Sequence, residues 1–365
     1  MTQTISVENR GRLTAAGFIG LYLHGIVVAM PGAFLGQWTD SFGKSVNIGL
    51  FYTLFLVSSF VGLAWVSRQK YRHPLFALAF ASIGFAFIMA GLAPTFRWIA
   101  GAALLFGFGD GMLNFHANNL VGELHPRHRI TVLNWANATF GLGALSAPLI
   151  NAALPWRGAF YLVAGATILA TALAWQAPPV QNFRPSQDQI QWQLARPFLL
   201  LILLYVGLES SIGTWSGSYL NSLGWNKDWQ SALLAAYWGG LTLGRMTLSA
   251  WVAPQPVQRL KVLLLMGMGA IALTSLPSFG FIFAIAAFLY GPTFATLFAL
   301  LQERCGHVAL GYLFYGAYLG KTLIPAGLDQ ISNPLDLRYG FLGLALLLYL
   351  SSLLLPRASA HQHGP

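Results

Sequence analysis

The fold of this chain is limited above all by a succession of apolar runs, separated by short polar stretches. Each run has about 20 residues, the length at which a helix crosses the hydrocarbon core of a bilayer. Only 8% of the 365 residues are charged, whereas soluble proteins carry about 25%. The sequence therefore predicts an all-α membrane protein with about twelve transmembrane helices. The runs lie at roughly 14–38, 46–66, 74–94, 97–120, 130–154, 158–177, 196–221, 229–252, 260–278, 281–302, 308–330 and 338–355.

The runs fall into two sets of six, and the segment between the sets differs from both in composition. "QAPPVQNFRPSQDQIQWQLARP" is polar and rich in proline, which is typical of a linker. We expect an N-terminal six-helix bundle over 1–180, a cytoplasmic linker over 181–195 and a C-terminal six-helix bundle over 196–365. The fifth run of each set has a Gly five residues before a Pro, in "GALSAP" and "GKTLIP". This repeat favours two pseudo-symmetric bundles, an architecture in which transporters place the substrate between the halves.

Basic residues are distributed unevenly between alternate loops. Because Lys and Arg concentrate in cytoplasmic loops, both termini are expected in the cytoplasm, with the chain in the plasma (bacterial inner) membrane. The net charge of +10 does not indicate a nucleic-acid partner, since the basic residues form short clusters and no single patch. With the N-terminus inside, fourteen basic residues fall on the cytoplasmic side, Arg10, Arg12, Arg68, Lys70, Arg72, Arg127, Arg129, Arg184, Arg196, Arg245, Arg259, Lys261, Arg304 and Arg357, and five on the other, Lys44, Arg97, Arg157, Lys227 and Arg338. Within this set, the candidates for gating or for fixing topology are Arg68, Arg127, Arg129 and Arg245.

Three ionisable residues, Asp110, Glu209 and Lys321, lie near the middle of their runs. A charge at the centre of a membrane helix costs roughly 2.5–3.5 kcal/mol, so such groups face a cavity or a partner and are functional by default. Asp110, Asn114 and Asn118 recur every four residues and therefore share one face of a helix. This pattern predicts a polar stripe on the fourth helix.

The stripes predict a water-accessible central cavity lined by amides and aromatic rings. Asp110 and Glu209 are the candidates for proton coupling, because burial favours the neutral form of a carboxylate. Amides and aromatic faces suit a neutral polyhydroxylated ligand. The structural alternative is a permanent ion pair between Lys321 and one of the two carboxylates. The candidate cavity residues are His24, Asn114, Asn118, Asn134, Asn137, Trp215, Tyr318 and Lys321.

Catalytic and cofactor chemistry is not indicated. "GFGDG" superficially suggests a phosphate loop, but no strand precedes it, so close helix packing is the better interpretation. "HPRHR" lies in a basic loop, and we expect neither a metal ion nor a cofactor. A membrane-embedded enzyme would need a nucleophile–base pair or a metal cluster, and the sequence shows no convincing one. Trp38, Trp98 and Trp156 lie near the ends of runs, which is typical of interface anchors.

These features together resemble the major facilitator superfamily over nearly the whole chain. Two regions are also similar to its fucose/glucose–proton symporter-like branch. That branch has an acid and then an Asn in the fourth helix, followed by a basic loop, "N…FGxGA…P" in the fifth helix, and "YVGxExxxGxWxxxYL" and "YWGGLxxGR" in the seventh and eighth. The first helix departs from the branch, because "LYLHGIVVAMPG" offers only His24 where the branch has an acid. The matching residues are Asp110, Asn114 or Asn118, Arg127, Arg129, Asn137, Gly141, Gly143, Ala144, Pro148, Glu209, Gly213, Trp215, Tyr219, Tyr237, Trp238, Gly239, Gly240, Gly244 and Arg245.

The resemblance implies a secondary transporter that alternates between inward-open and outward-open states, and no enzyme. The expected cargo is a sugar or a related small polar metabolite, with Asp110 coupling transport to protons and Glu209 as a second site or a seam residue. Two alternatives stay open: efflux of amphipathic organic compounds, and uptake of organic anions held by Lys321. The expected partners are a small-molecule substrate, protons and membrane lipids, with no nucleic acid. The protein is expected to be a monomer.

Overall fold

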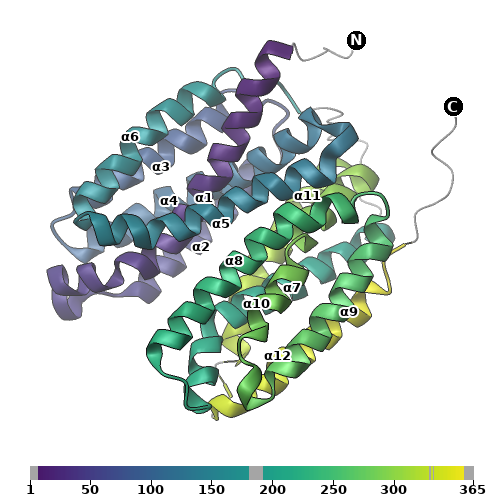
Figure 1. Cartoon of the computed structure of the whole chain (residues 1–365). Helices are drawn as coiled ribbons and strands as arrows, with labels where there is room; N and C mark the ends of the chain where they lie inside the picture. The colour runs from purple at the N-terminus through teal and green to yellow at the C-terminus, as the bar shows by residue number, and fades with distance from the viewer. Residues whose placement is uncertain (1–6, 181–191, 329, 332, 357–365) are drawn as a thin grey trace, which may run out of the picture. The chain divides into compact units, whose positions relative to one another are not determined.

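The computed structural model describes residues 7–180, 192–328, 330–331 and 333–356, and all regular structure in them is helical (Figure 1). The described part contains twelve α-helices, which confirms the expected all-α architecture. The chain divides into two compact units, Met1–Gln187 and Asp188–Pro365. Most of the expected linker, residues 181–191, lies outside the described residues, so the expected domain boundaries stay a prediction.

The first unit contains six α-helices, and α4 runs through its centre. α4 contacts α1, α2, α3 and α5, and every residue from Gly109 to Gly122 is buried. Each helix overlaps one of the first six apolar runs, so the local pattern located these elements well. The helices are α1 Val7–Phe42, α2 Ile48–Val66, α3 Leu75–Gly91, α4 Phe96–Leu124, α5 Arg129–Ala153 and α6 Trp156–Ala174, with short 3-10 helices at Gly43–Ser45 and Pro126–His128.

The glycines of "GFGDG" bring α4 close to its neighbours. A Cβ at Gly107 would collide with the carbonyl oxygen of Phe55 on α2, and a Cβ at Gly109 would lie 2.9 Å from the Ala79 carbonyl oxygen on α3. Small residues allow backbones in membrane bundles to approach this closely. The interpretation of these glycines as packing residues is confirmed.

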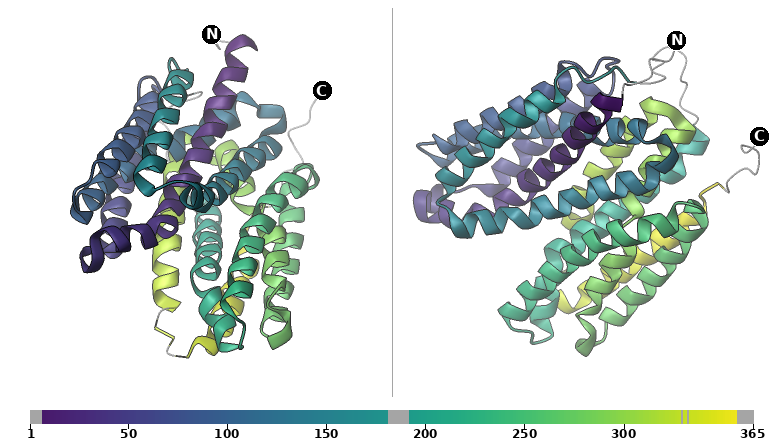
Figure 2. Two further views of the ribbon diagram at one scale, coloured as in Figure 1. Left: turned by 60° about the vertical axis from the view of Figure 1, so that its left-hand side comes forward. Right: turned by 45° about the horizontal axis from the view of Figure 1, so that its top comes forward.

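The second unit repeats the helix pairing of the first. In the first unit α1 packs on α5, α2 on α4 and α3 on α6; in the second α7 packs on α11, α8 on α10 and α9 on α12 (Figures 1 and 2). Adding six to each helix number converts one set of pairs into the other, as two copies of one fold require. The helices are α7 Trp192–Ser222, α8 Lys227–Val252, α9 Pro256–Thr274, α10 Ile282–Tyr290, α11 Thr293–Leu328 and α12 Leu337–Ser352, with 3-10 helices at Pro277–Phe279 and Pro334–Asp336.

The tenth and eleventh expected helices, 281–302 and 308–330, are divided differently in the structure. α10 ends at Tyr290, and α11 continues from Thr293 to Leu328 through the polar residues near 303. The break falls at Gly291–Pro292, because proline has no N–H to donate and clashes with the preceding turn. The loop expected between these two runs, residues 303–307, contains no proline. Nothing in its local sequence therefore forces the helix to end there.

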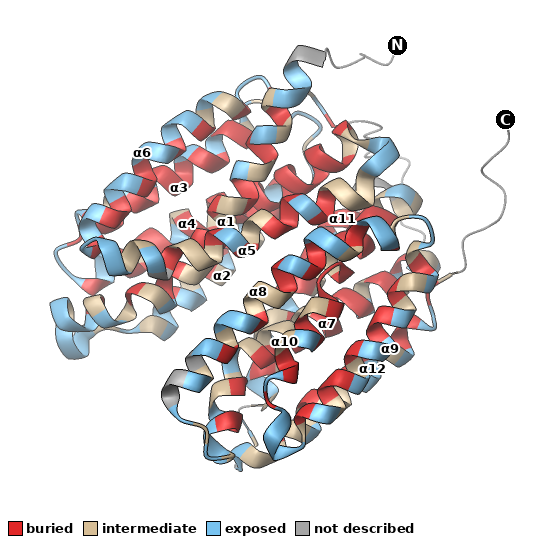
Figure 3. Cartoon of the chain, in the orientation of Figure 1, coloured by how far each residue is buried: buried red, intermediate tan, exposed pale blue. Residues whose placement is uncertain are grey.

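Large apolar side chains cover the outside of the helices. On α6, Leu162, Ile168 and Leu169 are 58–73% exposed, and this helix shows an outward strip of exposed residues in Figure 3. Eight of the described helices are long and apolar enough to cross a membrane, and α3 is a shorter apolar helix. A surface of this kind suits lipid contact.

Two of the three tryptophans expected at the interface lie in the core instead. Trp38 is fully buried, with its ring 5.7 Å from that of Phe96 and 6.2 Å from that of Phe160. Trp156 is 5% exposed and also packs on Phe160. Only Trp98, which is 53% exposed, keeps the expected position. Aromatic rings at the ends of α1 and α6 thus fill the end of the bundle.

Candidate functional site

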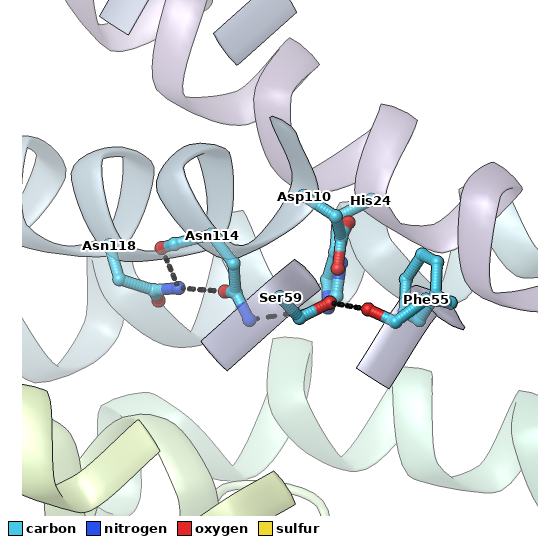
Figure 4. A network of polar contacts seen from close by, with 6 residues as sticks. All are labelled: His24, Phe55, Ser59, Asp110, Asn114 and Asn118. Carbon is cyan, nitrogen blue, oxygen red and sulfur yellow. Dashed lines mark hydrogen bonds and ion pairs between the residues drawn. The ribbon is translucent and has the colours of Figure 1, made fainter. Parts of the chain in front are cut away.

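Asp110 is a buried charge of the first unit, and its carboxylate contacts His24. Oδ1 of Asp110 on α4 lies 2.6 Å from Nδ1 of His24 on α1 (Figure 4). The Asp110 side chain is fully buried and that of His24 is 13% exposed. A short contact of this kind is typical of a charge-assisted hydrogen bond.

A ladder of asparagine amides continues from His24 away from Asp110. Nε2 of His24 lies 3.3 Å from Nδ2 of Asn114, and Oδ1 of Asn114 accepts from Nδ2 of Asn118 at 2.8 Å. Oδ1 of Asn118 then accepts from Nδ2 of Asn137 on α5 at 2.7 Å. We call these five residues the polar ladder. The stripe predicted on α4 therefore lies along one hydrogen-bonded path that joins α1, α4 and α5.

Close approach of α1 and α5 builds the setting of the ladder. A Cβ at Gly25 would collide with the Phe140 carbonyl oxygen, and a Cβ at Gly143 would collide with the Tyr22 carbonyl oxygen. The Phe140 ring packs 5.0 Å from the His24 ring. Gly25 on α1 and Gly143 on α5 thus allow the two helices to pack closely. His24, which directly precedes Gly25, is thereby held within reach of the polar stripe on α4.

Asn134, also predicted to line the cavity, hydrogen-bonds within its own helix. It is fully buried, and its Nδ2 donates to the Ile130 carbonyl oxygen at 2.9 Å. The structure therefore brings together five of the residues, while Asn134 donates to a carbonyl oxygen one turn earlier in α5. The five are His24, Asp110, Asn114, Asn118 and Asn137.

In the second unit, Glu209 of α7 pairs with Arg245 of α8. Nη2 of Arg245 lies 3.6 Å from Oε1 of Glu209, and the two side chains are 4% and 12% exposed. Nε of Arg245 donates to the Gly291 carbonyl oxygen at 3.3 Å, and the Tyr237 hydroxyl donates to the Glu209 carbonyl oxygen at 3.3 Å. Arg245 is one of the expected gating residues, yet it lies inside the unit as an inter-helix partner; its role in gating stays a prediction.

The remaining candidates of the second unit lie on α7 and α11. The indole N–H of Trp215 donates to the Pro325 carbonyl oxygen at 3.0 Å, which ties α7 to α11. Tyr318 is 7% exposed, and Lys321 is partly exposed one turn further along α11. Asp110 lies against His24 and Glu209 lies against Arg245, while pairing of Lys321 with a carboxylate stays a prediction.

Basic residues near the C-terminal end of α4 form hydrogen bonds and an ion pair with neighbouring segments of the first unit. Arg72 is fully buried, pairs with Glu123 at 2.8 Å and donates to the carbonyl oxygens of Pro178 and Pro179 at 3.3 and 3.2 Å. This pair is not among the predicted site residues, because "RQKYRH" is typical of an ordinary basic loop and nothing local marks its third base as buried. Among the predicted gating residues, Arg68 and Arg127 are exposed, while Nε of Arg129 donates to the Gly122 carbonyl oxygen at 3.0 Å.

His125, directly after α4, connects that end to α1. Its Nδ1 lies 3.1 Å from Nη2 of Arg10, and its Nε2 lies 2.9 Å from the hydroxyl of Thr14. Burial, followed by the positive charges of Arg10 and His128, lowers the pKa of His125. Neutral imidazole is therefore favoured at this position.

Metal ligands do not gather in the described residues, where no group of three or more His, Cys, Asp or Glu side chains is placed to hold an ion. The polar ladder itself combines one carboxylate, one imidazole and three amides. Such a set can bind a proton and can donate to or accept from hydroxyl groups.

Comparison with solved structures gives the same architecture. The chain is 14% identical to the fucose:proton symporter FucP of E. coli, covering 94% of this chain and 98% of that one, with a TM-score of 0.74. It is 12% identical to the proton:xylose symporter XylE bound to 6-bromo-6-deoxy-D-glucose (97% and 97% covered, TM-score 0.71). It is 17% identical to the human organic anion transporter MFSD10 (95% and 99% covered, TM-score 0.69). At these identities the likeness concerns the fold.

A search of curated protein sequences found no match. The family profile described as Major Facilitator Superfamily matches residues 17–326, which is most of the chain and extends over parts of both units. The chain therefore belongs to the Major Facilitator Superfamily and is a multi-pass membrane transporter.

Proposed function

We propose that this secondary transporter moves a small polar solute, a sugar or a related metabolite, and that it couples transport to protons at Asp110. Alternating access of the two units would carry the solute across the membrane. In the proposal the protein acts as a monomer in the plasma membrane, with both termini in the cytoplasm. Glu209 is assigned to the seam between α7 and α8, because its carboxylate lies against Arg245.

The observation that carries the proposal is the polar ladder. A fully buried carboxylate that contacts a partly exposed imidazole at 2.6 Å gives a proton a defined site next to a route from water. The amides that continue from His24 supply donors and acceptors of the kind that bind hydroxyl groups. Similarity of fold to two sugar–proton symporters supports this choice of cargo and of coupling ion.

Transport by the purified protein in proteoliposomes tests the coupling. We expect an imposed inward proton gradient to drive accumulation of labelled L-fucose, D-xylose or D-glucose by the wild-type protein. Asp110→Asn should abolish this accumulation while leaving counterflow exchange, which needs no net proton movement. Asp40→Asn is the matched control, since Asp40 is exposed near the end of α1 and should behave as wild type. Gradient-driven accumulation by Asp110→Asn equal to wild type would refute the coupling assignment.

The sugar class is tested separately by ligand stabilisation. A ligand that binds the folded state raises the unfolding temperature in proportion to the logarithm of its concentration. We expect sugars to give the largest shifts in a panel that also holds amino acids, organic acids and lipophilic cations. Shifts confined to another class would reassign the cargo and leave the fold and family unchanged.

Organic anions are the second candidate, because Lys321 places an ammonium group on α11, one turn after Tyr318. The likeness of fold to a human organic anion transporter agrees with this option. Lys321→Gln should then abolish stabilisation by organic anions without lowering expression. Retention of that stabilisation would remove Lys321 from the anion site.

A further inference from the structure

We propose that His24 is held as a neutral imidazole with its proton on Nδ1, and that the polar ladder fixes this tautomer, so that a transported proton binds Asp110 and not His24. His24 is then a positioning residue for the proton site. Its part in transport rests on the proposed function, whereas its protonation state follows from geometry alone.

The argument begins at Asn118, whose amide orientation is fixed by the backbone. Nδ2 of Asn118 donates one hydrogen to the Asn114 backbone carbonyl at 3.0 Å and the other to Oδ1 of Asn114 at 2.8 Å. A backbone carbonyl only accepts. A reversed amide would place oxygen against oxygen and lose both bonds, so nitrogen must face Asn114.

Asn137 fixes the other side of the same amide. Its Nδ2 donates to the Leu133 carbonyl oxygen at 2.9 Å and to Oδ1 of Asn118 at 2.7 Å. Here again a backbone carbonyl on the same helix uses one of the two hydrogens, and the second points to Asn118. Two helices, α4 and α5, therefore impose the same direction on the ladder independently.

This direction determines what Asn114 presents to His24. Since Oδ1 of Asn114 accepts from Asn118, its Nδ2, which carries only hydrogens, faces His24 at 3.3 Å. Nε2 of His24 must therefore be the unprotonated nitrogen, and Nδ1 carries the hydrogen donated to Oδ1 of Asp110 at 2.6 Å. An imidazolium would set an N–H against the amide hydrogens of Asn114.

Other titratable groups on the elements packed against His24 are directed elsewhere. On α5 its neighbour is the Phe140 ring, which does not titrate. On α1 the Tyr22 hydroxyl donates to Ser146, and on α4 the His116 ring lies against Phe76 and Phe115. The charged residues of α5 and α6, Arg129 and Arg157, lie in the first turns of their helices, so Asp110 on α4 is the charged group that faces His24.

The proton balance follows from these roles. Oδ1 of Asp110 accepts the Nδ1 hydrogen, so an incoming proton adds to Oδ2 and forms a neutral carboxylic acid. The net charge of the pair changes from −1 to 0, while His24 keeps one hydrogen throughout. Release of the proton from Oδ2 restores the carboxylate.

Nitrogen NMR of 15N-histidine-labelled protein tests the tautomer directly, without a transport assay. His24→Asn assigns the signals, because only those of His24 disappear. At about pH 7 we expect the spectrum of His24 to show one protonated ring nitrogen, Nδ1, and one unprotonated ring nitrogen, Nε2. Asn114→Asp is the matched variant: it replaces the amide hydrogens facing Nε2 by an acceptor, and Nε2 should then carry a hydrogen. An imidazolium or an Nε2–H tautomer in the wild-type protein would overturn the proposal.

Transport measurements test the positioning role. The side-chain nitrogen of Asn occupies roughly the place of Nδ1, so His24→Asn can keep the donor to Asp110 while removing the titratable ring. We expect the pH profile of its gradient-driven accumulation to match that of the wild-type protein, whatever the rate. His24→Leu removes the donor, and a lost hydrogen bond to a charged group should reduce accumulation about tenfold or more. Loss of proton coupling in His24→Asn with counterflow intact would make His24 the proton carrier and overturn the proposal. If Asp110→Asn stays fully coupled while the tautomer is as described, the proposed function fails and the tautomer assignment stands.

Discussion

Buried charges in this chain meet partners on other segments of the same unit. Asp110 meets His24, Glu209 meets Arg245 and Arg72 meets Glu123. A charge inside a low-dielectric interior is tolerated when a partner and further hydrogen bonds compensate for its lost hydration. Removal of one member of such a pair is therefore expected to destabilise its unit.

The Glu209–Arg245 pair provides a test of such compensation. Arg245→Met leaves the Glu209 carboxylate buried without its cation, which costs about 3 kcal/mol when a buried pair is broken. We expect a clearly lower unfolding temperature in detergent, partly restored in the double variant Glu209→Gln/Arg245→Met. Arg97→Met is the control, because Arg97 is exposed. The single variant Glu209→Gln completes the comparison. If the unfolding temperature of the double variant falls by the sum of the decreases in Glu209→Gln and Arg245→Met, the two side chains do not interact.

His125 predicts a dependence of stability on pH at the end of α4. Its pKa is lowered in the folded protein through burial and the charges of Arg10 and His128, below the ordinary value of 6.5. The unfolded chain therefore binds the proton more readily, so the stabilising contribution is present above about pH 6.5 and is lost as the pH falls through the folded pKa.

Unfolding temperatures measured from about pH 7.5 down to about pH 5.5 check this sign. We expect the wild-type protein to lose more stability on acidification than His125→Gln, which does not titrate. A larger acid loss in His125→Gln than in the wild-type protein would contradict the direction of the shift.

Much of the candidate site could be predicted at the residue scale, and its partners could not. The spacing of Asp110, Asn114 and Asn118 follows from helical periodicity, so their common face was predictable. The contact with His24 joins residues 86 positions apart. It depends on the rotation of α1 about its axis, which the packing at Gly25 and Gly143 determines and which no local pattern encodes.

At the scale of helices, glycine determines how closely two elements pack. Gly107 of α4 faces α2, where an added Cβ would collide with the Phe55 carbonyl oxygen, whereas a Cβ at Gly101 of the same helix would have only Met89 at 3.6 Å. Gly107→Ala should therefore separate α2 from α4 and cost about 1–3 kcal/mol. Gly101→Ala should be neutral or stabilising, since alanine favours helix by about 1 kcal/mol. Thermal unfolding of both variants checks the pair, and equal shifts would contradict the packing argument.

Helix positions were predictable where apolar runs end in clear polar loops, and less so elsewhere. α2 at Ile48–Val66 and α3 at Leu75–Gly91 lie within two or three residues of their expected bounds. The tenth expected run, 281–302, agrees with the candidate span Ile282–Cys305, but the helix break lies at Gly291–Pro292, and the polar residues near Glu303 belong to a helix and not to a loop. Charged residues exposed on a helix are compatible with continued helix, whereas the Gly291–Pro292 break acts on the backbone itself.

At the scale of the whole molecule, the repeat of helix pairs links the sequence to transport. Each unit pairs its first helix with its fifth, its second with its fourth and its third with its sixth. The first unit carries the Asp110–His24 pair, while the second carries the Glu209–Arg245 pair. The two units therefore share one arrangement of helices but differ in the side chains that pair inside them. Under the proposed function, we infer that the proton site belongs to the first unit and a structural ion pair to the second.

The asymmetry of basic residues predicts the orientation of the molecule, with fourteen Lys and Arg on the expected cytoplasmic side against five on the other. In a Cys305→Ser background, which removes the chain's one cysteine, single cysteines at exposed positions report the side of the membrane. We expect Ser45→Cys and Asn221→Cys to react with a membrane-impermeant maleimide on intact cells, and His128→Cys and Gln255→Cys to react only after permeabilisation. All four positions are exposed, so failure to label reflects the membrane barrier. Positions from both units are needed, because an even number of crossings before Asn221, in place of the expected seven, would reverse the result for the second unit alone. Labelling of His128→Cys on intact cells would contradict the expected orientation of the first unit, since its positively charged loops would then lie outside.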